Sequence, residues 1–86
     1  MDVRITLEDL EDINVELEDL LRQIERIDNR EFLKEKIVSL KNDGFKVYEL
    51  ICNNETEENK GIVGTAHKIK KEIDETLINI HKYLSF

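Results

Sequence analysis

The sequence predicts an all-α protein, either an antiparallel helical hairpin or a small three- or four-helix bundle with coiled-coil-like packing. Three observations lead to this fold class. Apolar residues recur at steps of three and four near both ends of the chain, proline is absent, and hydrophobic (40%) and charged (38%) residues are balanced as in a folded, soluble chain. The 86 residues are expected to form one helical domain, residues 1–86.

The first segment carries the strongest helical pattern and predicts a helix from about Thr6 to Ile27. Six of its apolar residues follow one another at alternating steps of three and four, which is a heptad pattern, and Leu21 widens the stripe. Thr6, with Asp9 three residues later, has the spacing of a capping-box variant at the helix start. The apolar stripe comprises Leu10, Ile13, Leu17, Leu20, Leu21, Ile24 and Ile27.

The heptad phase slips after this segment, and two interpretations stay open. The step from Ile27 to Leu33, the next apolar position, is six residues rather than seven. Asp28 or Asn29 caps a second helix at this point, or one long helix continues with its stripe rotated.

The clearest break in the chain is the segment 42–44, which reads Asn-Asp-Gly. We expect a helix to end at Gly44, because glycine is common just past helix ends. The alternative is a β-hairpin at about residues 37–50, since Asp-Gly is a strong turn signal, and the fold would then be α+β. The helical interpretation is preferred, because the alternation typical of a strand is lost between Tyr48 and Cys52.

The last segment predicts a helix over about residues 62–84. Asn53 or Asn54 is a candidate cap for it, with Glu55, Glu57 and Glu58 in the first turn. An antiparallel arrangement would place the acidic first helix beside the lysine-rich part of this helix, Lys60, Lys68, Lys70 and Lys71. Its apolar face is formed by Ala66, Ile69, Ile73, Leu77, Ile80 and Leu84.

The net charge of −7 is concentrated at the beginning of the chain. Residues 1–31 hold eleven acidic and four basic groups, whereas residues 32–86 hold nine of each. This balance disfavours direct binding to nucleic acid and to lipid headgroups, and no apolar run is long enough for membrane insertion. We expect either a solvated helix face or a surface that attracts a basic partner. This acidic face comprises Glu8, Asp9, Glu11, Asp12, Glu16, Glu18 and Asp19.

The sequence indicates no catalytic site, metal site or cofactor, so we expect a protein that is not an enzyme. His67 and His81 lie fourteen residues apart, about 21 Å along one helix, and cannot share a metal ion within one chain. The stretch Ala66-His67-Lys68-Ile69-Lys70 resembles the phosphorylated stretch of histidine phosphotransfer domains. That family has a glycine where this chain has Lys71. Both histidines, and Cys52, are expected at or near the core.

The small size and the single cysteine limit how the chain is stabilised. One cysteine excludes a disulfide within the chain and favours a reducing compartment. Because the first residues do not resemble a signal peptide, a cytoplasmic location is expected, with leaderless export left open. A chain of this length builds a thin core, so a partner chain or a second copy is the expected additional support.

Short stretches resemble known helical families. The length of the chain and the glycine segment 42–44 resemble the WXG-like helical hairpins of type VII secretion, although the characteristic tryptophan is absent. The stretch 65–73 is similar to part of the N-terminal helical domain of syntaxins. Size, charge and helicity are similar to those of small acidic immunity proteins, secretion chaperones and phage-encoded inhibitors.

These features predict a non-catalytic protein-binding module, a small acidic adaptor, chaperone or inhibitor that acts by helix–helix packing with a partner chain. The apolar stripe would enter a groove of the partner and the acidic face would steer the approach. Equally open is that the stripe is the domain's own core. The alternatives are an acidic mimic of nucleic acid that blocks a basic groove, a self-assembling helical bundle such as a homodimer, and a WXG-like secretion partner.

Overall fold

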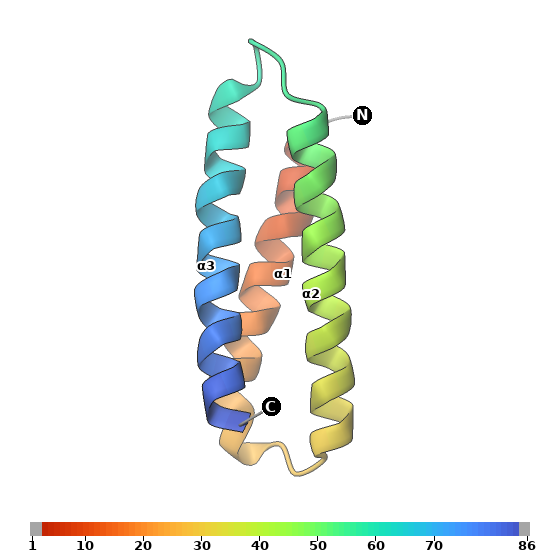
Figure 1. The fold of residues 1–86 in the computed structure, drawn as a ribbon, viewed down its shortest axis with the longest axis vertical. Coiled ribbons are helices and arrows are strands. Elements are labelled where there is room, and N and C mark those ends of the chain that lie inside the picture. Colours follow the sequence, from red (N-terminus) through yellow and green to blue (C-terminus); the bar gives the residue numbers. More distant parts are fainter. Residues whose placement is uncertain (1–2, 85–86) are drawn as a thin grey trace.

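The computed structural model describes residues 3–84 and contains three long helices. They are α1 (Val3–Gln23), α2 (Arg30–Asn53) and α3 (Lys60–Leu84), and a 3-10 turn, η1 (Ile24–Arg26), follows α1. The helices lie side by side in a rod of 46 × 18 × 18 Å (Figure 1). Consecutive helices run in opposite directions (Figure 1). The expected all-α fold is therefore confirmed, as a small three-helix bundle.

The structure of the middle of the chain differs from the prediction, because α2 passes through residues 42–44 without interruption. The helix end expected at Gly44 and the alternative β-hairpin at residues 37–50 are both wrong. Gly44 is itself a buried core position, and a Cβ placed there would lie 3.5 Å from Ile13 Cγ2. Burial of the apolar residues at the same heptad spacing outweighs the cost of one glycine, about 1 kcal/mol. The core line of α2 is Leu33, Ile37, Leu40, Gly44, Val47 and Ile51.

The start of α1 also differs from the prediction, whereas the start of a second helix agrees with one of the two interpretations. The helix begins at Val3, three residues earlier than expected, because Val3 is buried in the core. Thr6 therefore lies inside the helix, where it is buried, and the capping-box prediction is wrong. A separate second helix is confirmed by its cap, since Asn29 Oδ1 accepts a hydrogen bond from the Phe32 N–H at 3.0 Å.

Asparagine side chains shape the connection between α2 and α3. The prediction that Asn53 or Asn54 caps the last helix is wrong, because Asn54 ends α2 and its Nδ2 donates to the Leu50 carbonyl at 2.7 Å. Asn59 stands just before α3, and its Oδ1 accepts from the Thr56 N–H at 2.6 Å. The glutamates expected in the first helical turn lie in this connection: Glu55, Glu57 and Glu58.

α1 and α3 run in the same direction, so the antiparallel pairing expected for the two strongest helices is wrong (Figure 1). The reason is topological: two short connections with a full helix between them return the chain to its first direction. The lysines of α3 find acids nearby in sequence instead. Lys60 Nζ lies 3.1 Å from Glu57, and Lys70 Nζ lies 2.7 Å from Asp74.

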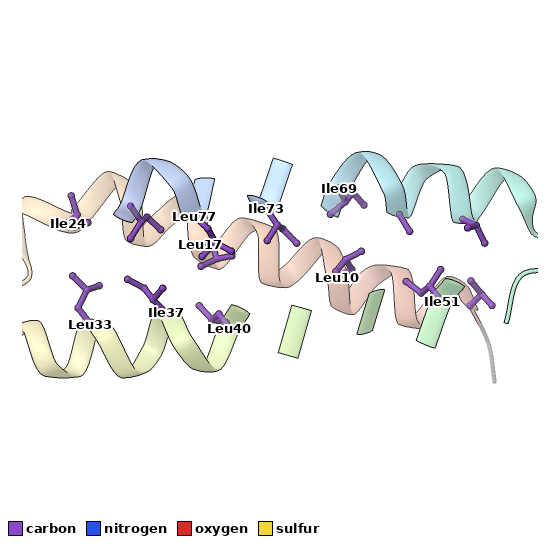
Figure 2. Close-up of a cluster of buried hydrophobic side chains, with 14 residues drawn as sticks. Leu10, Leu17, Ile24, Leu33, Ile37, Leu40, Ile51, Ile69, Ile73 and Leu77 are labelled. Atoms are coloured by element: carbon purple, nitrogen blue, oxygen red, sulfur yellow. The ribbon is translucent and has the colours of Figure 1, made fainter. Parts of the chain in front are cut away.

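The core is a column of aliphatic side chains along the bundle axis. Figure 2 shows side chains from all three helices pointing toward this axis. α1 packs more extensively against α2 and against α3 than these two pack against each other. Its buried apolar residues Val3, Leu10 and Leu17 recur at every seventh position, and Ile24 in η1 continues the line.

The substitution Gly44→Ala is expected to stabilise the bundle by about 0.5–1 kcal/mol. Alanine removes the conformational freedom of a mid-helix glycine, and its methyl group would only reach ordinary contact with Ile13. Urea denaturation followed by circular dichroism measures the change. Gly61→Ala is the matched control, because it lies in the first turn of α3 with no atom within 4 Å of the added methyl group. A loss of stability confined to Gly44→Ala would show that Ile13 cannot accommodate the methyl group.

Candidate protein-binding surfaces

The apolar stripe predicted to bind a partner is covered by the chain's own helices. Leu10 and Leu17 are completely buried and Ile24 is 6% exposed. The remaining members are half-buried and pack against the same core: Ile13, Leu20, Leu21 and Ile27. The stripe is thus the core of the bundle, which is the second of the two interpretations left open. A partner could reach its buried residues only if the helices separated.

The acidic face lies on the surface of α1 and partly borders α2, where Asp9 and Asp12 line one hollow with Lys46 and Glu16 and Asp19 line another with Lys36. Six of its seven carboxylate side chains belong to exposed residues, and Glu18 is half-buried. Within residues 3–84, Arg22 is the one basic residue that pairs with them, 3.8 Å from Glu18 and 3.3 Å from Asp19. Five carboxylates therefore form no ion pair within the described chain: Glu8, Asp9, Glu11, Asp12 and Glu16.

Two exposed apolar side chains stand among these acids. Ile5 is 60% exposed and Val15 is 53% exposed. They belong to a line along the outside of α1 at steps of three and four, here called the outer line: Ile5, Glu8, Asp12, Val15 and Asp19. The sequence analysis missed Ile5 and Val15 because the stronger inner stripe dominates the apolar pattern. In the sequence, Ile5 and Val15 belong to a second and sparser heptad line on the opposite side of the helix, and this line indicates an exposed apolar pair.

A buried amide lies on the side of α1 that faces α3. Asn14 is 8% exposed, and its Nδ2 donates to Glu72 Oε2 at 2.9 Å. Its Oδ1 is buried without a hydrogen-bond partner among residues 3–84, which costs about 1–3 kcal/mol. The sequence analysis missed Asn14, although a polar residue at this heptad position, between Leu10 and Leu17, was a visible signal.

The groove between α2 and α3 combines aromatic, apolar and basic side chains. Tyr48 and His67 meet across it with a Tyr48 Oη to His67 Nδ1 distance of 2.6 Å and a T-shaped ring arrangement. Burial, followed by contact with Cys52, raises the pKa of the Tyr48 hydroxyl above its ordinary value. The hydroxyl thus keeps its proton, and the tautomer of His67 sets which of the two groups donates. Below this pair the groove is lined by Lys41, Asn42, Phe45, Lys70, Ile73, Asp74 and Leu77.

The described chain has neither a metal-binding cluster nor a membrane-spanning helix. Among residues 3–84, no three His, Cys, Asp or Glu side chains are placed to hold a metal ion. None of the helices in this range combines the length and the apolar character that crossing a membrane requires. Cys52 is half-buried, one turn beyond Tyr48 on α2, and has a free thiol.

The assignment of the inner stripe to the core is tested by Leu17→Ala, which is expected to cost about 2–5 kcal/mol of unfolding free energy. The side chain is completely buried, so its removal leaves a cavity. The matched control is Val15→Ala on the outer line, where a change within about 0.5 kcal/mol is expected. Thermal or urea unfolding measures both variants. Equal effects at the two positions would contradict the burial of Leu17.

The segment on which the resemblance to WXG-like hairpins rested, residues 42–44, is the middle of α2 rather than a turn. Comparison of the whole chain with protein-family models, with curated proteins and with solved structures finds no match. The surfaces of this chain are therefore the basis for its functional assignment.

Proposed function

We propose that the chain is a non-catalytic protein-binding module that presents the outer side of α1 to a basic, amphipathic segment of another protein chain. The observation that carries the proposal is the exposed acidic face with Ile5 and Val15 set into it. As an adaptor, a chaperone or an inhibitor, the module would act by helix–helix packing. The contact uses the outer line of α1, because the inner stripe is occupied by α2 and α3.

The charge pattern supports this proposal. Five carboxylates without an ion pair in the described chain produce a negative potential on one side of the rod. Such a potential accelerates the approach of a basic partner and orients it, although it adds little affinity by itself. Affinity requires apolar contacts that become buried when the partner binds. Ile5 and Val15 are exposed apolar side chains on the same surface and would make such contacts.

A second candidate function, an acidic mimic of nucleic acid, is favoured by the same unpaired carboxylates. They lie along one helix and could occupy a basic groove of a protein that handles DNA or RNA. Such a mimic depends on charge, whereas helix packing also depends on Ile5 and Val15. The two functions are therefore separable by substitution.

The charge requirement is tested with the double variant Asp12→Lys/Glu16→Lys. Its dissociation constant for a synthetic amphipathic helix of leucine and lysine, measured by fluorescence anisotropy, is expected to rise at least about tenfold, or about 1.4 kcal/mol. The variant Glu55→Lys/Glu58→Lys changes the net charge equally but lies in the connection before α3, and it should bind like the wild-type chain. Equal losses in both variants would mean that net charge, and not the outer side of α1, governs binding.

The apolar requirement is tested with Ile5→Ser/Val15→Ser and the same peptide. We expect weaker binding together with an unchanged helical signal, because both side chains are exposed and contribute little to the core. Unchanged binding would favour the charge-based mimic over helix packing. If the wild-type chain does not bind the basic peptide at all, the proposed function is contradicted.

A further inference from the structure

We infer that the α2–α3 groove binds the outer side of α1 of a second copy of this chain. Each copy then contacts the next through two different surfaces. The inference rests on the proposed function, because it names the partner that the acidic face would bind. Its observations come from the opposite side of the bundle. There α2 and α3 leave apolar and basic side chains without a covering helix.

α2 carries a second heptad line beside its core line. Residues at steps of three and four form this line: Val38, Lys41, Phe45, Tyr48 and Cys52. Lys41 and Phe45 line the groove and Tyr48 meets His67 across it, whereas Val38 extends the line on the surface of α2. Phe45 is 57% exposed and Val38 is also exposed, while Tyr48 and Cys52 are half-buried. On α3, the exposed Ile78 lies one turn beyond Asp74 and extends the apolar surface. A second apolar line on one helix is typical of a helix that packs against more than one neighbour.

The charges of the groove complement those of the outer line. Lys41 and Lys70 line it, and Lys41 forms no ion pair within residues 3–84. Lys70 is held at 2.7 Å from Asp74, and its Nζ lies 5.6 Å from the centre of the Tyr48 ring. The unpaired carboxylates of α1 are the complementary group, and they lie outside the α2–α3 groove of the same chain.

The two surfaces also match in length. Ile5 and Val15 lie ten residues apart, about 15 Å along α1, and Val38 and Tyr48 lie the same ten residues apart along α2. Acidic residues stand between the first two, and Lys41 stands between the second two.

The contact joins two different surfaces, so it is heterologous. Each copy that binds through α1 still offers a free groove, and each copy that binds through its groove still offers α1. An interface of this kind extends into open chains unless its rotation closes a ring. Association is thus expected to depend on concentration and to give species larger than a dimer.

Two variants each remove one surface. The acidic-face variant, Asp12→Lys/Glu16→Lys, keeps the groove, and the groove variant, Val38→Ser/Phe45→Ser, keeps the outer line of α1. Sedimentation velocity over a concentration series, with circular dichroism on the same samples, should show folded monomers for each variant alone and larger species for the wild-type chain. The acidic-face variant has a smaller net negative charge, which by itself favours association, so a monomer would show that a specific surface was lost.

Two control variants distinguish the loss of either surface from a general change in net charge or in exposed apolar area. Glu55→Lys/Glu58→Lys makes the same change in net charge away from both surfaces. Phe32→Ser removes a phenylalanine of α2 that is 56% exposed and lies outside the second heptad line. Both controls are expected to associate like the wild-type chain. If either control is monomeric, the assignment of the contact to α1 and the groove is wrong.

The decisive measurement mixes the two monomeric variants in equal amounts. The intact α1 of the groove variant should bind the intact groove of the acidic-face variant and give a one-to-one heterodimer that cannot grow. A mixture that remains monomeric overturns the inference, and so does an acidic-face variant that dimerises alone, which would place the contact groove to groove. If the wild-type chain is monomeric but binds the basic peptide through α1, self-association fails while the proposed function stands. If it does neither, both fail.

Discussion

The bundle depends on the burial of one line of side chains along α1 and η1 against both other helices. Val3, Leu10, Leu17 and Ile24 recur at every seventh residue and lie between α2 and α3. The single cysteine excludes a disulfide within the chain, so this aliphatic column is the main internal restraint among residues 3–84. Because α2 and α3 pack less extensively on each other, the positions of both are set mainly by α1.

This dependence determines which surfaces remain for a partner. Once α1 turns its strongest apolar stripe inward, its acids necessarily point outward, and the sparser pair Ile5 and Val15 goes with them. On the other side, α2 and α3 meet along a groove where Phe45 is left exposed beside Lys41 and Lys70. The same packing that stabilises the fold thus separates an acidic surface from an aromatic and basic one.

The middle of the rod departs from regular aliphatic packing. Ile13 faces Gly44, a core position without a side chain, and the neighbouring Asn14 turns its amide toward Glu72 on α3. A helix-interior glycine costs about 1 kcal/mol, and a half-satisfied buried amide costs more. The hydrogen bond from Asn14 is lost if α3 shifts along α1, so this polar contact adds to the apolar packing in fixing the alignment of the two helices.

The sequence by itself determined the helical class, the heptad stripe of α1, the face of the last helix and the location of the acids, because spacing along a helix sets which residues share a side. The tertiary structure decided what covers each side. It alone placed the Leu10 and Leu17 stripe in the core, carried α2 through Gly44, and brought Tyr48 to His67 across the groove. Local spacing reports that a face is apolar, but whether the face meets its own chain or another depends on contacts between residues far apart in sequence.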